Sequence, residues 1–278
     1  MNWFTLDLTI FAGSVLAGLV GALTGLGGGV IIIPMLALAL GIDIRYAIGA
    51  SLVSVIATSS GAAAAYVKEG FTNIRIGMFL EMATTVGALL GAGLAGLLPT
   101  NIIAIIFGCV LVYSTWLTLH PVGPQSLAAK PDRLATKLRM DSSYPDQGVE
   151  QQYHVQRVPQ GFAVMSVAGA LSGLLGIGSG AVKVLAMDTV MRIPFKVSTT
   201  TSNFMIGVTA AASAGIYLNR GYIDPGLTFP VMLGVLAGAW LGTKVLVRAR
   251  TKSLRLLFAI VILVLGLEMI YKGLTKGL

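Results

Sequence analysis

The stretch GALTGLGGGVIIIP, residues 21–34, joins two apolar segments through a run of glycines. Four of the five residues from Gly25 to Gly29 are glycine, and each glycine costs a helix interior about 1 kcal/mol. The flanking residues are as apolar as those of a membrane span. The stretch therefore predicts a helix that is broken at membrane depth, where the freed backbone N–H groups need a cavity rather than lipid.

The composition places the whole chain in a membrane. Its 278 residues are 55% hydrophobic and 11% charged, with a mean hydropathy of +0.85, whereas soluble domains carry about 25% charge. The net charge is +8, but the basic residues stand singly or in short groups between apolar blocks. This pattern is typical of membrane topology and argues against nucleic-acid binding. We expect an all-α integral protein of the cytoplasmic (inner) membrane, surrounded by the lipid bilayer.

Motifs for covalent or metal chemistry are absent from the sequence. Cys109 is the single cysteine, which excludes an internal disulfide and a cysteine-based metal cluster. Neither a zinc-protease motif nor a nucleophile elbow nor a phosphate-binding loop occurs. We expect no enzymatic activity, no metal and no cofactor, and keep an intramembrane enzyme and a non-transporting membrane component as less favoured alternatives.

The glycine run occurs twice. AGLVGALTGLGGG (17–29) aligns with AGALSGLLGIGSG (168–180) at an offset of 151 residues. The same register aligns Ser51 with Ser202, and GALLG (87–91) with GAWLG (238–242), over about 75 positions without a gap. The chain therefore contains a duplicated unit, a common feature of secondary transporters.

Each unit contains four apolar blocks, at 8–41, 46–67, 76–98 and 101–119, and at 161–191, 197–218, 226–247 and 254–274. The first block of each unit is too long for one straight span. If it crosses once, the basic residues of loops and termini divide ten to eight between the two sides; if it returns to its starting side, they divide fourteen to four. The positive-inside rule favours the second arrangement. It predicts two inverted repeats of about five helical segments each, with the first pair short or broken at the glycine loop.

This arrangement defines three parts of the chain. Residues 1–119 and 161–278 form the two membrane repeats, and residues 120–160 form a cytoplasmic connector, with both termini outside. Within the connector, we expect a short basic helix at 130–140 and a small hairpin at 143–158. A solvated linker is the alternative for this segment.

Inverted units bring both glycine loops towards one site at the membrane midplane. Helix N-termini there offer N–H donors and partial positive charge to an anion. We predict that a small anionic substrate binds to Gly25, Gly27, Gly28, Gly29, Ser51, Gly176, Gly178, Ser179, Gly180, Lys183, Ser202 and Asn203. By contrast, the Gly87/Gly91 and Gly238/Gly242 pairs have the spacing of helix packing.

Lys183 and Glu81 are charged residues within apolar blocks. Lys183 is expected to attract the anion, because an intramembrane lysine is a functional candidate by default; an ion pair with Asp188, or snorkelling to an interface, is the alternative. Glu81 is expected at the membrane interface, with proton carriage as its alternative. We favour a proton as the coupling ion, since no acidic cluster suggests a sodium site.

Gly25-Leu-Gly-Gly-Gly29 with Pro34, the echo Gly176-Ile-Gly-Ser-Gly180 and the stretch 180–207 together resemble the sulfite exporter TauE/SafE family (TSUP transporters). The resemblance implies a secondary transporter of sulfur-containing anions, such as sulfite, thiosulfate or the organosulfonate sulfoacetate, working by alternating access. An anion channel and a transporter of another small organic anion are the alternatives. Ser179 replaces the third glycine of the second loop and adds a hydroxyl. The several small-residue faces leave a homodimer open.

Overall fold

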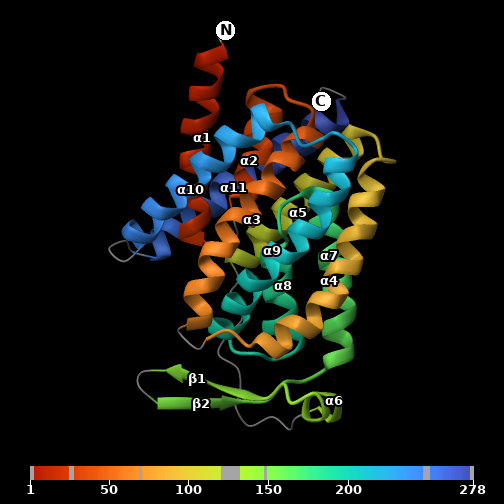
Figure 1. Ribbon diagram of the computed structural model, residues 1–278, viewed down its shortest axis with the longest axis vertical. Helices are drawn as coiled ribbons and strands as arrows, with labels where there is room; N and C mark the ends of the chain where they lie inside the picture. Colours follow the sequence, from red (N-terminus) through yellow and green to blue (C-terminus); the bar gives the residue numbers. More distant parts are fainter. Residues whose placement is uncertain are drawn as a thin grey trace.

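The structure is a computed structural model that describes residues 3–24, 28–68, 71–119, 132–146, 149–246 and 251–275. Most of these residues are helical (Figure 1). The first half contains α1 (Trp3–Thr24), α2 (Gly29–Pro34), the π-helical segment η1 (Met35–Ala39), α3 (Ile44–Lys68), α4 (Ile74–Ala95) and α5 (Thr100–Leu119). The second half contains α7 (Val158–Leu175), α8 (Gly180–Leu185), the π-helical segment η2 (Ala186–Val190), α9 (Phe195–Asn219), α10 (Pro225–Leu246) and α11 (Thr251–Leu274).

The helix boundaries repeat at the offset that aligns the sequence. α3 begins at Ile44 and α9 at Phe195, 151 residues later, and the starts of α4 and α10 keep the same offset. Both short helices continue into a π-helical segment of five residues at equivalent positions. Each half therefore has five successive helical segments, as the apolar blocks predict.

The first segment of each half corrects one expectation. α1 has 22 residues and α7 has 18, so neither is short. At 1.5 Å per residue, α1 is about 33 Å long, enough for a hydrocarbon core of about 30 Å. Only α2 and α8, with six residues each, are short. α1 begins at Trp3 and α7 at Val158, before the predicted block starts at 8 and 161, so a full-length helix precedes each break.

Several helix pairs join the two halves: α1 with α10, α4 with α7, α5 with α11, α3 with α9, α4 with α9 and α3 with α10. In the α4–α7 pair, backbones touch directly. A Cβ atom on Gly87 or Gly91 would collide with the backbone of Ser166 or Ala170, respectively. Gly238 of α10 meets the backbone of α1 in the same way. The predicted packing role is confirmed for these three glycines, and the surroundings of Gly242 lie outside the described part.

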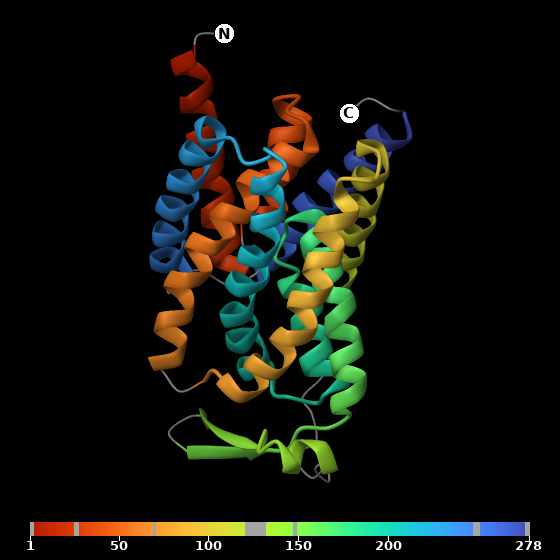
Figure 2. The same cartoon turned by 45° about the vertical axis from the view of Figure 1, so that its right-hand side comes forward.

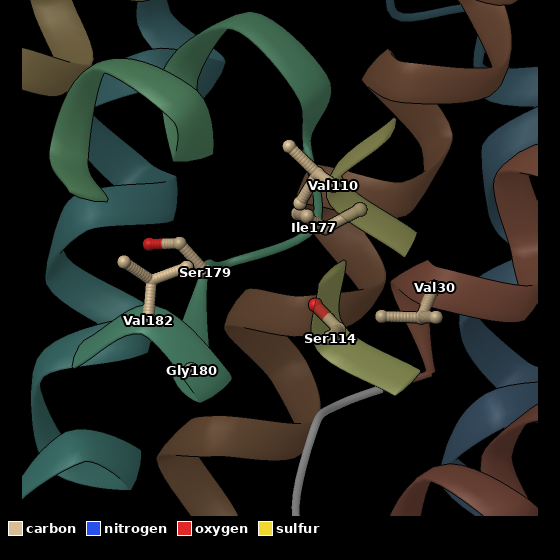
Figure 3. Close-up of a pocket in the computed structure, with 7 residues that line it drawn as sticks. All are labelled: Val30, Val110, Ser114, Ile177, Ser179, Gly180 and Val182. Carbon is tan, nitrogen blue, oxygen red and sulfur yellow. The ribbon is translucent and has the colours of Figure 1, made fainter. Parts of the chain in front are cut away.

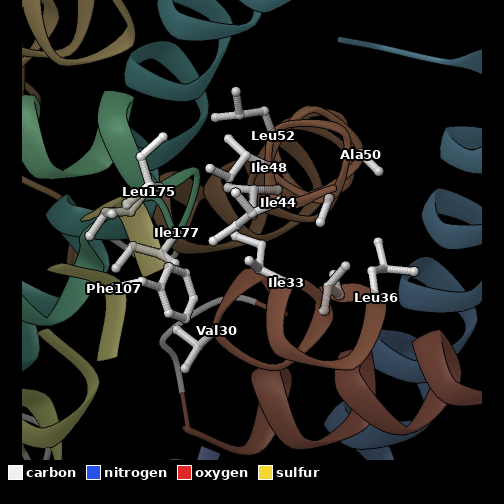
Figure 4. Close-up of a cluster of buried hydrophobic side chains, with 14 of the residues drawn as sticks. Val30, Ile33, Leu36, Ile44, Ile48, Ala50, Leu52, Phe107, Leu175 and Ile177 are labelled. Carbon is white, nitrogen blue, oxygen red and sulfur yellow. The ribbon is translucent and has the colours of Figure 1, made fainter. Parts of the chain in front are cut away.

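A core of fully buried apolar side chains surrounds the short helices. Figure 4 shows Val30 and Ile33 of α2 lying near Phe107 of α5 and Ile48 of α3. Ile177, in the loop after α7, belongs to the same cluster. The start of α2 and the second glycine loop are therefore embedded in protein, as irregular backbone within a membrane protein must be.

The outer surface of α4 carries an apolar stripe. Met78, Met82, Val86 and Leu90 recur every four residues and are all more than half exposed. A helix facing water would place polar residues there, so this stripe is suited to lipid. Within the described residues, Ile74–Ala95 and Val158–Leu175 are long and apolar enough to cross a membrane, and shorter apolar stretches lie in α1, α3, α5 and α10.

The connector lies at one end of the bundle, opposite the end where α1 begins and α11 finishes (Figures 1 and 2). It contains α6 (Arg133–Lys137) and a hairpin of β1 (Ser142–Asp146) with β2 (Val149–Tyr153). The predicted basic helix and hairpin are thus confirmed, although residues 147–148 of the turn lie outside the described residues. Asn73, the N-cap of α4, donates to the Met140 carbonyl at 3.0 Å and to the Tyr153 hydroxyl at 2.7 Å. Burial raises the pKa of Tyr153 to about 12, so this hydroxyl stays protonated near neutral pH.

Candidate functional site

The second glycine loop turns the chain sharply between α7 and α8. Gly176 and Gly178 have φ values of +65° and +69°, and Ser179 has a φ of +44°. The left-handed region is uncommon for a residue with a side chain. In the first half, the equivalent Gly28 has a φ of −66°. The two loops therefore differ in conformation at the position where Ser179 replaces glycine. The left-handed conformation of Ser179 is unfavourable, so contacts with the surrounding residues must stabilise it.

The two glycine breaks meet inside the bundle. A Cβ atom on Gly29 would lie 3.1 Å from the Gly176 carbonyl oxygen and would collide with the Ser51 hydroxyl. Ser51, on α3, donates to that same carbonyl at 2.8 Å. A side chain of the first half thus holds the loop of the second half.

A small cavity lies beside this contact (Figure 3). Its walls come from α2, α5 and the second glycine loop with the start of α8: Val30, Val110, Ser114, Ile177, Ser179, Gly180 and Val182. Its volume is about 10 Å³, roughly the space that one water molecule needs. A cavity of this size has no room for a sulfur oxyanion. The Ser179 hydroxyl is buried and has no hydrogen-bond partner among the residues that the structure describes.

The remaining predicted site residues fall into three groups. Ser202 reaches the second loop and donates to the Gly180 carbonyl at 3.3 Å. Gly28 is buried against side chains of α2 and α10, and Asn203 is half-buried on α9 without lining the cavity. Gly25 and Gly27 lie outside the described residues.

Lys183 comes directly after the cavity-lining Val182 on α8, but its ammonium group does not line the cavity. The side chain is fully buried, and Nζ donates to the Thr209 hydroxyl on α9 at 2.5 Å. Thr209 in turn donates to Glu81 Oε1 on α4 at 2.6 Å. The charge that acts on Lys183 is Glu81. The alternatives of an ion pair with Asp188 and of snorkelling are therefore wrong.

Glu81 is enclosed between helices rather than exposed at the protein surface. It is 7% exposed and points into the bundle. Its Oε1 also accepts from the Thr85 hydroxyl at 3.2 Å, whereas its Oε2 is buried without a hydrogen-bond partner in the described part of the chain. Sequence reasoning missed this network because it joins α4 of one half to α8 and α9 of the other.

Apolar helices with lipid-suited outer faces, broken helices that meet inside and charges enclosed between them define a polytopic membrane transport protein. The family described as sulfite exporter TauE/SafE has a model that matches residues 10–269. The chain belongs to this family. The resemblance seen in the glycine motifs is thereby confirmed.

Curated relatives cover nearly the whole chain. The probable membrane transporter protein YunE of Bacillus subtilis (strain 168) is 29% identical over 93% of this chain and 95% of its own length. The probable membrane transporter protein YdhB of the same organism is 26% identical, over 85% and 87% of the two chains. A probable membrane transporter protein of Xylella fastidiosa (strain 9a5c) is 24% identical, over 97% and 96%. No solved structure matches the chain. The family is described as a sulfite exporter family, and these relatives are named as probable membrane transporters.

Proposed function

We propose that this protein is a secondary transporter that carries small sulfur-containing anions across the cytoplasmic membrane, either sulfite or an organosulfonate such as sulfoacetate. One observation carries the proposal: the glycine break of each half meets the other at a closed cavity. Gly29 adjoins the Gly176 carbonyl there, and Val30 shares the cavity wall with Gly180. The family supplies the class of anion.

The two halves are proposed to be inverted repeats, residues 1–119 and 161–278, joined by a cytoplasmic connector of residues 120–160. The packing supports this division. The repeat offset makes α1 equivalent to α7 and α10 equivalent to α4, and the two largest interfaces are α1 with α10 and α4 with α7. The start of α1 and the end of α11 share one end of the bundle, opposite the connector (Figure 2). In this proposal that end faces outside.

The anion is proposed to bind at the midplane to the first turns of the two short helices. Each short helix and its π-helical extension form 11 continuous residues, Gly29–Ala39 and Gly180–Val190. The first N–H groups of a helix lack intrahelical partners and carry partial positive charge. The Ser179 hydroxyl adds an unpaired donor on the cavity wall. The small cavity fits an occluded step of alternating access, after which α2 and α8 separate to admit the substrate.

Ligand stabilisation of the purified protein tests the cargo. Sulfite, thiosulfate, sulfoacetate, sulfate and short carboxylates are compared by thermal unfolding. An anion at 100 times its Kd stabilises the folded state by about 2.7 kcal/mol. Ser179→Ala should reduce the shift, whereas Ser166→Ala, which removes a hydroxyl that bonds its own helix on α7, should not. If folded protein responds to none of the sulfur anions, the proposed cargo is wrong.

Transport in proteoliposomes tests the mechanism. If the protein is a transporter, proteoliposomes loaded with unlabelled anion accumulate labelled anion by exchange. The uptake rate then saturates as the anion concentration rises. A channel shows neither property. Flux that rises linearly with concentration and lacks exchange would refute alternating access.

A further inference from the structure

Two opposite charges are enclosed between the halves of the protein. Glu81 comes from the first half, and Lys183 and Thr209 come from the second. The hydrogen bonds run from Lys183 to Thr209 and from Thr209 to Glu81 without interruption. Removing such a pair from water is costly, so a buried ion pair is weak evidence of a stabilising role. Ionisable groups within membrane helices instead point to function.

The positions that the repeat offset makes equivalent to these residues carry no charge. At the repeat offset, Ile32 corresponds to Lys183 and Met232 to Glu81, while Thr58 corresponds to Thr209. There the Thr58 hydroxyl bonds carbonyls of its own helix. Apolar side chains therefore suffice for this helix arrangement, and the charge pair serves something other than the fold.

Glu81 has an atom ready to accept a proton. A carboxylate accepts hydrogen bonds on both oxygens, and a buried acceptor without a donor is unfavourable. Glu81 Oε1 is bonded by Thr209 and Thr85, while the buried Oε2 has no partner among the described residues. Protonation at Oε2 would remove the buried negative charge and keep the bonds to Oε1.

Lys183 is the charged group that acts on Glu81. α7, which packs along α4, contains no titratable residue in Val158–Leu175. The other titratable residues on the surrounding elements are Arg75 on α4, Lys196 and Tyr217 on α9, and Asp188 on η2. Along α9, Lys196 and Tyr217 lie about 20 Å and about 12 Å from Thr209. Arg75 donates to the Arg139 carbonyl of the connector.

We propose that Glu81 binds the proton that is transported together with the anion, with Thr209 linking it to Lys183. This inference rests on the proposed function. Without substrate, the Glu81 carboxylate and the Lys183 ammonium sum to zero charge. An anion that enters beside α8 adds a negative charge to this dry region, and a proton from water on Glu81 Oε2 restores neutrality. Lys183 then balances the anion, and one proton accompanies each monoanionic head group.

Calorimetric titration of the purified protein tests the inference. Thiosulfate, sulfoacetate and methanesulfonate are the probes, because their ionisation does not change between about pH 6 and about pH 8. Titrations in two buffers with different heats of ionisation give the number of protons taken up per anion. In the wild type, we expect uptake of about one proton with methanesulfonate, which is a monoanion, and an affinity for it that falls by up to about tenfold for each unit that the pH rises. Glu81→Gln should bind with no proton uptake and no pH dependence.

Two further variants complete the design. Glu268→Gln, which neutralises an exposed carboxylate on α11, should behave like the wild type. The double variant Lys183→Ile with Glu81→Met copies the residues of the first half; it should unfold cooperatively and lose both anion binding and proton uptake.

Each outcome separates this inference from the proposed function. Anion binding without proton uptake in the wild type, or equal uptake by Glu81→Gln, overturns the role of Glu81 and leaves the transporter standing. A double variant that fails to fold makes the charges structural and also overturns it. If folded wild-type protein binds none of the three probes at either pH, the proposed function falls, and the coupling falls with it.

Discussion

The contact between α4 and α7 allows a sharp test with two alanines placed two residues apart. A Cβ atom on Gly91 would lie 2.7 Å from the carbonyl carbon of Ala170 and 2.9 Å from its Cα. Favourable carbon contacts begin at about 3.5 Å, and the Ala170 carbonyl oxygen lies closer still than these two carbons, so Gly91→Ala forces the two backbones apart by about 1 Å or more. Overpacking of this kind costs about 1–3 kcal/mol. A Cβ atom on Gly93, on the same helix, would meet nothing within 4 Å.

Gly93→Ala is the matched control, because both substitutions remove about 1 kcal/mol of glycine's helix penalty and this gain cancels between them. At about 2–4 °C per kcal/mol, Gly91→Ala should unfold about 2–12 °C below Gly93→Ala. The assay is thermal unfolding of the detergent-purified protein at one scan rate, since unfolding of membrane proteins is often irreversible. Equal unfolding temperatures, or a higher one for Gly91→Ala, would refute the backbone contact between α4 and α7.

Three further substitutions probe contacts between the halves and the connector. Ser51→Ala removes the bond to the Gly176 carbonyl and should lower the free energy of unfolding by about 1 kcal/mol; an unchanged unfolding temperature would contradict this. Tyr153→Phe removes the acceptor of the Asn73 amide and should speed tryptic cleavage of the connector, while equal cleavage rates would show that the hairpin is held by its apolar contacts. Arg220→Gln loses two bonds to carbonyls in the last turn of α4, and the cost should stay near 1 kcal/mol because the side chain is exposed; a loss above about 3 kcal/mol would point to a further partner.

The sequence predicted the scaffold well because its determinants are local or repeated. Block lengths and glycine breaks fixed the helices, and the 151-residue offset carried them from one half to the other. The connector hairpin followed from a turn signal and from alternation. The length of α1 was misjudged, because the helix begins at Trp3, five residues before the apolar block from which its length was predicted. Helix pairs such as α1 with α10 could not be predicted from the sequence, since they depend on packing between distant segments.

The site was only partly predictable, because its hydrogen bonds cross between the halves. The approach of Gly29 to Gly176 agrees with the expectation that the two glycine loops meet, but the cavity beside them depends on side chains of α5 that carry no motif. Nothing in the spacing of Glu81, Lys183 and Thr209 indicates that they meet, since α5, α6 and α7 separate Glu81 on α4 from the other two residues. Burial of a carboxylate near a helix start cannot be read from the sequence when the burying helices are far away.

The departures from the repeat were the more informative signal. Where both halves have the same residue type, the position serves the scaffold they share, as Gly87 and Gly238 do in backbone packing. Where the two halves have different residue types at equivalent positions, the fold does not require either residue, because one half adopts the same helix arrangement without it. Lys183 in place of Ile32 and Ser179 in place of Gly28 stood out on this ground. Glu81 in place of Met232 meets the same criterion. Comparison of the two halves therefore marks this carboxylate as a functional candidate from the sequence alone, although only the packing of α4 against α9 shows that Lys183 is its partner.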